Sequence, residues 1–336
     1  MNKSLNMREL RERIISFENI LIITHINPDP DTLGSALGLK KIFNKLNKTS
    51  HIVCATKVNE RVCGYFGVTP ELDAHAAESS GFKPERVICV DAAALDQIGS
   101  YADSKIDLVI DHHVTNTFYG RETYLDAGAA ATGEIIFELA KAFGFEIGEI
   151  DEIDKDFARD IYCAVISDSG SFRYATTTPK TLTAAAELIS TGFDFAGLNR
   201  LIYQNKSITQ IALERLAYNS LKFTLGGKAA FIIITREMKK AAGLAGVEIT
   251  GINEIPRTVE GVEVGAVIRE ADPDEDGESG KAGVFYVSLR SNEYVNVAEI
   301  AADFGGGGHI RAAGCTYKGD ADVLERELIK KIEKVL

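Results

Sequence analysis

Short apolar runs alternate with amphipathic segments along the first half of the chain. Residues 20–23 are apolar throughout and too few for a helix, and residues 34–46 behind them place apolar side chains at helical spacing. This order is typical of a strand followed by a crossover helix. The same pattern predicts buried strands at 52–55, 87–90 and 106–110, and helices at 132–143, 157–166 and 179–189. We therefore expect an α/β fold whose N-terminal part is a mostly parallel sheet flanked by helices.

The pattern changes after residue 193. Residues 194–222 are mostly amphipathic and predict a helical connector, and strands are then predicted at 229–235, 262–269 and 283–289. The acidic stretch at 271–281 predicts an exposed hairpin loop, because it lacks the spacing and the final glutamate of a calcium-binding loop. We expect a first domain over 1–193, the connector over 194–222, and a smaller α/β domain over 223–336.

Composition narrows the expected partners. The chain has 336 residues, 37 basic and 49 acidic, and a formal net charge of -12. This charge opposes capture of a long nucleic-acid backbone. No apolar run reaches the roughly 20 residues of a membrane helix, and the first residues lack the apolar core of a signal peptide. The five cysteines stand far apart without a CxxC pair. We expect a cytoplasmic protein with free thiols and no membrane contact.

One loop combines an imidazole with two carboxylates. His25, Asp29 and Asp31 follow the first predicted strand, and Pro28 and Pro30 stiffen the loop around them. A rigid loop can direct several ligands at one metal ion. The alternative is the acidic start of a helix, which explains Asp31 but leaves His25 and Asp29 without a role.

Further metal-compatible side chains end other predicted elements. Asp91 follows the strand at 87–90, the sequence Asp111-His112-His113 follows the strand at 106–110, and Asp168 ends a predicted helix. In open parallel sheets, such groups gather at the carboxyl ends of the strands. The absence of thiolates favours Mg or Mn over structural zinc, and two imidazoles favour Mn. The ligands exceed the need of one ion and fit two ions that share a carboxylate: His25, Asp29, Asp31, Asp91, His112 and Asp168.

A glycine-rich segment near the C-terminus predicts a phosphate clamp. Its four successive glycines let the backbone approach an anion, while an imidazole and a guanidinium add charge. The candidate clamp residues are Gly306, Gly307, Gly308, His309 and Arg311. The alternative is a flexible turn with ordinary surface side chains. Arg290 and Arg173 are further candidates, and each is equally well explained as a surface arginine.

The motifs resemble, in order, those of the DHH phosphoesterases. The matching segments are THINPDPDTLGS, VDAA, VIDHHVTN and SDSGSFR, and GGGGHIRAAG resembles the glycine-rich motif of the DHH-associated domain. The resemblance implies that one metal ion is held by His25, Asp29 and Asp91. It implies that a second ion is held by Asp31, Asp91, His112 and Asp168. It also implies that His113 faces the substrate phosphate and that Asp111 orients the two histidines, which makes these two the candidate catalytic residues.

Within the superfamily, the chain looks most like the bacterial nanoRNase and 3′-phosphoadenosine 5′-phosphate phosphatase group. The resemblance implies a hydrolase with two Mn2+ ions, or Mg2+ in their place, that acts on very short oligoribonucleotides and nucleoside bisphosphates. It would release nucleoside 5′-monophosphates from the former and phosphate from the latter. The alternatives are a phosphodiesterase for linear or cyclic dinucleotides, an inorganic pyrophosphatase, and a nucleotide-binding regulator without turnover. The sequence leaves the oligomeric state open, a homodimer included.

Overall fold

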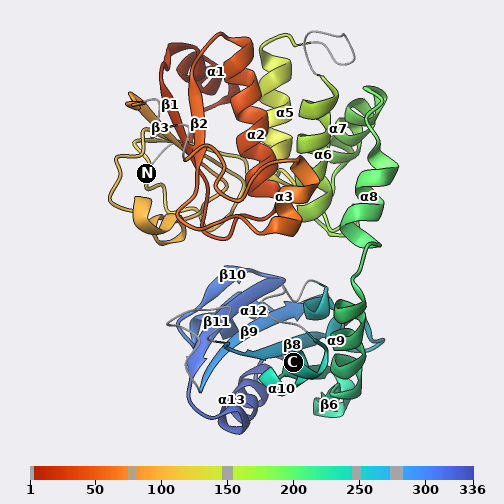
Figure 1. Cartoon of the computed structure of the whole chain (residues 1–336). Helices are drawn as coiled ribbons and strands as arrows, with labels where there is room; N and C mark the ends of the chain where they lie inside the picture. The colour runs from red at the N-terminus through yellow and green to blue at the C-terminus, as the bar shows by residue number, and fades with distance from the viewer. Residues whose placement is uncertain (1–3, 75–76, 78–80, 146–153, 244–250, 273–282) are drawn as a thin grey trace. The chain divides into compact units, whose positions relative to one another are not determined.

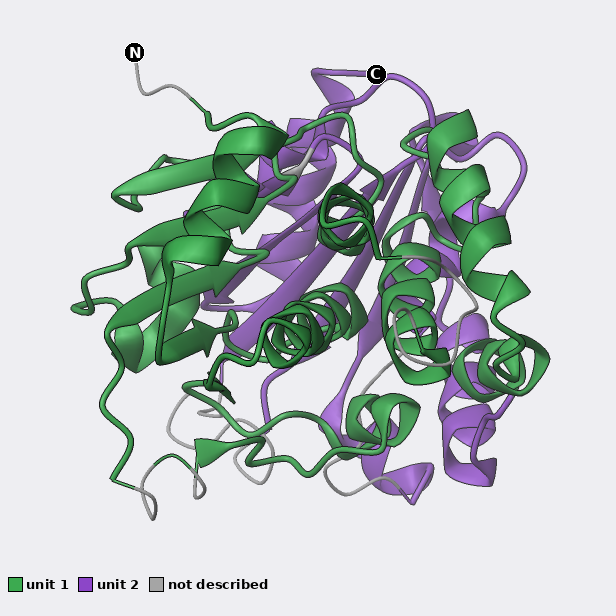
Figure 2. Ribbon diagram, turned by 90° about the horizontal axis from the view of Figure 1, so that it is seen from above, with its two compact units in different colours: residues 1–204 green, residues 205–336 purple. Residues whose placement is uncertain are grey.

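The computed structural model describes the whole chain except residues 1–3, 75–76, 78–80, 146–153, 244–250 and 273–282. It consists of two compact units, unit 1 over Met1–Gln204 and unit 2 over Asn205–Leu336, coloured separately in Figure 2. Nearly all of the acidic stretch expected to form a hairpin loop lies outside the described residues. In the part of the chain that the structure describes, no helix is both long and apolar enough to cross a membrane.

Unit 1 is built on a five-stranded parallel sheet with the strand order β2-β1-β3-β4-β5. The strands are β1 Ile20–Ile23, β2 Ser50–Val53, β3 Arg86–Val90, β4 Leu108–Asp111 and β5 Glu122–Leu125. The expected α/β class with a parallel sheet is confirmed. The edge strand β5 is an addition, because its sequence ETYL has too few apolar residues to stand out as a buried run.

Helices flank this sheet (Figure 1). They are α1 Met7–Ser16, α2 Pro30–Lys45, α3 Glu60–Phe66, α5 Thr132–Ala142, α6 Lys155–Asp168, α7 Pro179–Ser190 and α8 Phe195–Tyr203, with a 3-10 segment at Leu95–Tyr101. The helices α2 and α6 pack closely through glycine. A Cβ atom on Gly34 would lie 2.4 Å from the carbonyl oxygen of Asp160, and one on Gly38 would lie 2.5 Å from Ile161 Cδ1. This contact fixes the first half of α2 against the middle of α6.

Unit 2 contains a six-stranded mixed sheet with the order β10-β11-β9-β8-β7-β6. Its strands are β6 Lys222–Thr224, β7 Ala229–Ile234, β8 Val264–Glu270, β9 Val284–Ser291, β10 Gly307–His309 and β11 Ala312–Lys318. Only the pair β7–β8 is parallel among those described. The helices are α9 Ile208–Asn219, α10 Arg236–Ala241, α12 Val297–Ala302 and α13 Ala321–Glu333, with 3-10 segments at Ile252–Glu254 and Pro256–Thr258.

Two segments differ in detail from the sequence pattern. Residues 194–222 contain two helices, α8 and α9, and the first residue of β6, and the two units divide between the helices. The glycine-rich segment forms the antiparallel hairpin β10–β11, in which Gly307 pairs with Gly314 and Gly308 with Ala313. A Cβ atom on Gly306 would lie 2.1 Å from the carbonyl oxygen of Gly314, so the hairpin itself requires glycine there.

Candidate metal centre

The loop after β1 is held by the start of its own helix. Asp29 is the N-cap of α2, and its Oδ1 accepts a 3.0 Å hydrogen bond from the backbone N–H of Thr32. Pro30 occupies the first helical position, where no N–H is needed. Asp31, in the first turn, is fully buried, and the Asp29 side chain is half exposed. His25 donates its Nδ1–H to the carbonyl oxygen of Ile26 over 2.8 Å, so its Nε2 is available as a metal ligand.

Asp91 lies at the centre of the site. It follows β3, whose neighbours in the sheet are β1 and β4. Its backbone has a φ of 58°, in the left-handed region that non-glycine residues rarely adopt. Such strain costs roughly 1–3 kcal/mol and persists only where the surroundings over-determine it, which is typical of functional sites.

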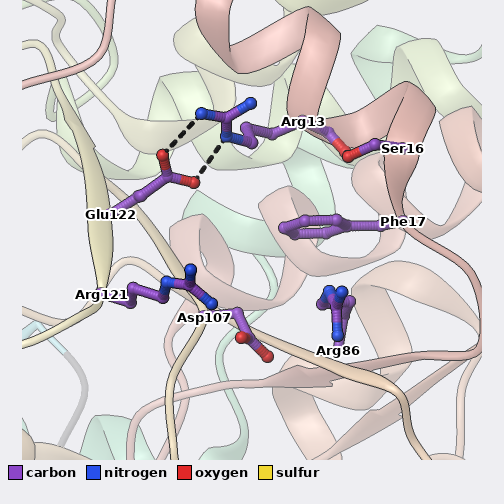
Figure 3. A pocket seen from close by; sticks show the side chains of 7 residues that line it. All are labelled: Arg13, Ser16, Phe17, Arg86, Asp107, Arg121 and Glu122. Carbon is purple, nitrogen blue, oxygen red and sulfur yellow. Dashed lines mark hydrogen bonds and ion pairs between the residues drawn. The ribbon is translucent and has the colours of Figure 1, made fainter.

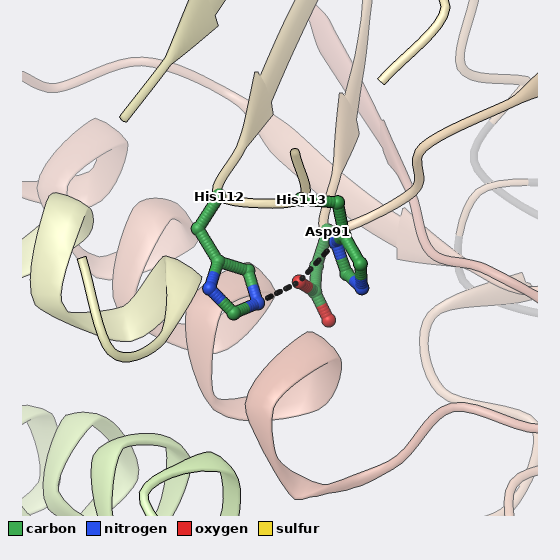
Figure 4. Close-up of side chains that lie close together, drawn as sticks. All are labelled: Asp91, His112 and His113. Atoms are coloured by element: carbon green, nitrogen blue, oxygen red, sulfur yellow. Dashed lines mark ion pairs between the residues drawn. The ribbon is translucent and has the colours of Figure 1, made fainter. Parts of the chain in front are cut away.

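The carboxylate of Asp91 faces histidines on several sides. His25 Nε2 lies 3.9 Å from Asp91 Oδ2 and also 3.9 Å from Asp29 Oδ2. His112 Nε2 and His113 Nδ1 each lie 3.7 Å from Asp91 Oδ1, and Figure 4 shows both rings directed at this carboxylate. The structure therefore brings the loop after β1 and the ends of β3 and β4 to one point.

A second group of ligands surrounds His112. Its Nε2 lies 3.3 Å from Asp168 Oδ2 and 3.7 Å from Asp31 Oδ2. The Nδ1–H of His112 is donated to the carbonyl oxygen of Ala129 over 3.2 Å, which fixes the ring. Asp168 is the last residue of α6, and the chain reverses after it through three residues with φ between 56° and 62°, Gly170, Ser171 and Phe172.

These side chains form sets that could hold metal ions. Two of the sets are His25, Asp29 and Asp91, and Asp31, His112 and Asp168, and the donor atoms within each lie within 4.8 Å of one another. Two donors that are each about 2.1 Å from one ion at octahedral right angles lie about 3 Å apart. The observed separations are slightly wider and need only small side-chain movements. Carboxylates and imidazoles without thiolate fit Mg or Mn.

The electrostatics of the site favour bound cations. Burial, followed by the charges of Asp91 and Asp168, raises the pKa of Asp31 well above its ordinary value. Burial, followed by the charge of Asp29, raises the pKa of Asp91 to about 6. Burial would lower the pKa of His112, but the hydrogen bond with Asp168 and the charges of the other carboxylates raise it. The carboxylates repel one another in a buried space, and divalent cations would relieve this repulsion.

Two threonines that sequence reasoning did not assign to the site hold the carboxylates. Thr32 Oγ1 donates to Asp91 Oδ2 over 2.6 Å, and Thr132 Oγ1 donates to Asp91 Oδ1 over 2.8 Å. Asp31 accepts the backbone N–H groups of Thr132 and Gly133 over 2.8 and 2.9 Å. These N–H groups belong to the first turn of α5, where they have no partner inside the helix. The only sequence signal that Thr132 holds the carboxylates is a hydroxyl residue at the first position of α5.

Asp111 anchors His113. Its Oδ1 accepts His113 Nδ1–H over 2.7 Å and the backbone N–H of His112 over 2.8 Å, and its Oδ2 accepts the side-chain amide of Asn116 over 2.6 Å. Burial would raise the pKa of Asp111, but these bonds lower it. Burial would likewise lower the pKa of His113, and the bond with Asp111 raises it. Sequence reasoning did not single out Asn116.

The arginines of the expected clamp are engaged within their own units. Arg311 donates from Nη1 to the carbonyl oxygen of Val295 over 2.9 Å and from Nη2 to that of Glu293. Arg290 donates from Nε to Glu254 Oε1 over 3.1 Å. Arg173, in unit 1, donates from Nε to the carbonyl oxygen of Gly170 over 2.7 Å and is exposed. Gly306, Gly307 and Gly308 run into and along the edge strand β10, which ends at His309.

The family follows from comparison with known proteins. The DHH family, N-terminal domain, matches residues 19–165, and the DHHA1 domain matches residues 260–336. The chain belongs to the DHH family. The probable bifunctional oligoribonuclease and PAP phosphatase NrnA of Streptococcus mutans is 30% identical over 306 residues, which is 90% of each chain. The bifunctional oligoribonuclease and PAP phosphatase NrnA of Thermus thermophilus is 28% identical over 98% of this chain and 94% of its own.

A solved structure shows the same fold. The crystal structure of an exopolyphosphatase-related protein from Bacteroides fragilis has a TM-score of 0.82 and 24% identity to this chain, covering 98% of this chain and 94% of its own. Together, the domain matches and these relatives confirm the resemblance to DHH phosphoesterases with a DHH-associated domain.

Proposed function

We propose that this member of the DHH family hydrolyses phosphoesters in short oligoribonucleotides, releasing nucleoside 5′-monophosphates, and in 3′-phosphoadenosine 5′-phosphate, releasing phosphate. The observation that carries the proposal is the group of carboxylates and imidazoles around Asp91. The two NrnA relatives, which align over nearly their whole length, carry this pair of activities in their names. We therefore favour this pair of activities over the alternatives of a dinucleotide phosphodiesterase, an inorganic pyrophosphatase and a regulator without turnover.

Two divalent ions fit the charge of the ligands. We assign His25, Asp29 and Asp91 to one ion, and Asp31, Asp91, His112 and Asp168 to a second. With neutral imidazoles, the four carboxylates among these residues carry four negative charges, which two divalent cations would offset. Two imidazole donors favour Mn2+ over Mg2+. When bound, the ions make a water molecule acidic and offset the negative charge of the phosphoryl oxygens.

His113 is the residue that we assign to the substrate phosphate. Its Nδ1–H is held by Asp111, and this hydrogen bond to a carboxylate raises the pKa of His113. A protonated ring can donate its Nε2–H to a phosphoryl or leaving oxygen, where it would stabilise developing negative charge. Asp111 is in turn held by Asn116, so the ring orientation does not depend on the substrate.

We assign substrate binding to residues 223–336 and chemistry to residues 1–193, with 194–222 between them. The clamp would use backbone N–H groups along β10 together with His309, Arg290 and Arg311. Arg173, in unit 1, remains a separate candidate for binding a substrate phosphate. Arg311 donates two N–H groups to backbone carbonyl oxygens, which leaves it fewer donors for a phosphate. These two hydrogen bonds also support residues 293–295. A few arginines suffice for a small substrate, whereas the net charge of -12 disfavours a long polymer.

A panel of substrates tests the proposal. Purified protein in Mn2+ would be given 3′-phosphoadenosine 5′-phosphate, linear dinucleotides, short oligoribonucleotides, cyclic dinucleotides and pyrophosphate, and the products would be separated by chromatography. We expect phosphate from the first substrate and nucleoside 5′-monophosphates from the linear oligomers. Asp91→Asn protein, prepared in parallel, controls for contaminating nucleases. Turnover of cyclic dinucleotides or pyrophosphate alone would replace the proposed substrate class, and no turnover of any substrate would favour a regulator.

A further inference from the structure

A hollow lies at the amino edge of the parallel sheet of unit 1, away from the candidate metal centre. Its volume is about 210 Å³, and its lining residues come from the end of α1 and from the starts of β3, β4 and β5, as Figure 3 shows. Arg86 is the first residue of β3, and Asp91 follows the last residue of the same strand. The hollow and the candidate metal centre therefore lie at opposite ends of the strands. None of its lining residues belongs to the metal-ligand sets.

Part of the charge around the hollow is already neutralised. Arg13 and Glu122 form a two-point ion pair, with Nε to Oε2 at 2.7 Å and Nη2 to Oε1 at 2.9 Å. This pair closes one side of the hollow and leaves two other guanidinium groups, those of Arg86 and Arg121, facing a single carboxylate, that of Asp107.

The two remaining arginines have donors available. Arg86 gives one N–H to the carbonyl oxygen of Glu85 over 2.7 Å, and its guanidinium lies 5.6 Å from the centre of the Phe17 ring, which steadies it. Arg121 is exposed, and its guanidinium has no hydrogen-bond or ion-pair partner among the residues that the structure describes. Both groups keep their charge at any physiological pH.

Asp107 adds an acceptor to these donors. It is 9% exposed, and its Oδ2 accepts the backbone N–H of Val87 over 3.1 Å. Its other oxygen can accept a hydrogen bond from a ligand. A group that both accepts from guanidinium and donates to carboxylate matches this lining, as a singly protonated phosphate or a hydroxyl-bearing phosphate monoester does. A fully ionised anion without a donor would be repelled by Asp107.

We propose that this hollow is a binding site for a phosphate group, either of orthophosphate or of a nucleoside monophosphate. The size supports a small ligand, because pockets for drug-sized molecules begin at about 300 Å³. Beyond the Arg13–Glu122 pair, the lining carries two guanidinium groups and one carboxylate, so it keeps a net positive charge that attracts anions in a chain of net charge -12. The site does not depend on the proposed function, since neither the metal ligands nor the glycine-rich hairpin takes part in it.

Hydrogen exchange with mass spectrometry locates such binding. Full-length protein would be labelled in a chelating buffer with and without millimolar orthophosphate, and separately with and without adenosine 5′-monophosphate. We expect slower exchange in peptides that cover residues 13–17, 86–88 and 120–123. Protection at lower concentrations of the monophosphate would identify a monoester site, and equal or better protection by orthophosphate would identify a site for the free anion.

Variants show whether the arginines carry the binding. Arg121→Ala should raise the ligand concentration needed for half-maximal protection at least roughly tenfold, because it removes a charge-assisted hydrogen bond. Arg121→Gln, which keeps most of the side chain, should do the same and serves if the alanine variant folds poorly. Arg8→Ala is the matched control, because the Arg8 side chain on α1 is 87% exposed and lies outside the hollow. Absence of protection in wild-type protein, or protection unchanged in both Arg121 variants, would overturn the proposal.

Discussion

Asp91→Asn should have opposite effects on activity and on the stability of the metal-free protein. Asp91 is 2% exposed, and its pKa is raised to about 6 from an ordinary value of 3.8. The folded state therefore binds the proton more tightly than the unfolded state does. Stability contributed by this group is complete below pH 3.8, and it is lost as the pH rises to about 6. A shift of this size corresponds to about 3 kcal/mol.

The asparagine variant removes the free-energy cost of burying an ionised carboxylate without changing the shape of the side chain. Asparagine tolerates the left-handed backbone of residue 91 better than most residues, and a threonine hydroxyl can accept its amide as well as donate to its oxygen. At neutral pH in chelator, we expect the free energy of unfolding of the variant to exceed that of wild type by up to about 3 kcal/mol. Near pH 4, the difference should nearly vanish.

Activity should fall at the same time. Asp91 is the carboxylate assigned to both ions, and no neighbour can replace it, so we expect a loss of about 4 kcal/mol of transition-state stabilisation, or roughly a thousandfold in kcat. Urea unfolding at two pH values and steady-state hydrolysis in Mn2+ measure the two effects. The reasoning is refuted if the variant is less stable than wild type in chelator at neutral pH, or if it keeps more than about a tenth of the wild-type kcat.

Three further predictions follow from the site. Thr132→Val should weaken Mn2+ binding about 10- to 100-fold while Thr132→Ser stays near wild type, as measured by metal titration; equal affinities would show that the hydroxyl does not orient Asp91. Chelation should abolish hydrolysis, and Mn2+ should restore it better than Ca2+, which is larger and polarises water weakly; equal rates with Ca2+ would contradict the assignment. Arg311→Ala should weaken binding of a substrate with a terminal phosphate at least roughly thirtyfold without changing Mn2+ affinity. Arg326→Ala, at an exposed position on α13, is the control and should leave substrate binding unchanged. If Arg311→Ala keeps the preference for the phosphorylated substrate, the phosphate is bound elsewhere, and Arg290 and Arg173 are the next residues to test.

The sequence predicted those strands and helices whose own pattern of apolar residues or capping residues is determined by their burial or their ends. The strand β1 is a continuous apolar run because both faces of a parallel sheet are covered, and the start of α2 carries its own N-cap and proline. The strand β5 and the hairpin β10–β11 were not predicted. The strand β5 has too few apolar residues to stand out as a buried run, and the glycines and alanines of the hairpin have little strand propensity, so pairing with neighbouring strands determines their conformation.

In the candidate site, too, sequence reasoning found the residues at strand ends and missed those brought in by tertiary packing. The rule that ligands gather at the carboxyl ends of parallel strands was enough to place Asp91 beside His112. It could not reveal Thr132, whose backbone N–H donates to the carboxylate of Asp31, 101 residues away, and which meets it only through the packing of α5 against α2. Nor could it show that the guanidinium of Arg311 is directed to backbone carbonyls, because a carbonyl acceptor has no sequence signature.

The number of ions bound by the chain tests the central claim most directly. Equilibrium dialysis against Mn2+, with bound metal measured by elemental analysis, would be run on wild type and on Asp91→Asn. The account predicts two ions per wild-type chain, hydrolysis that rises with occupancy of the weaker site, and loss of at least one ion from the variant. Full hydrolytic activity with one ion per wild-type chain, or two tightly held ions in the variant, would contradict it.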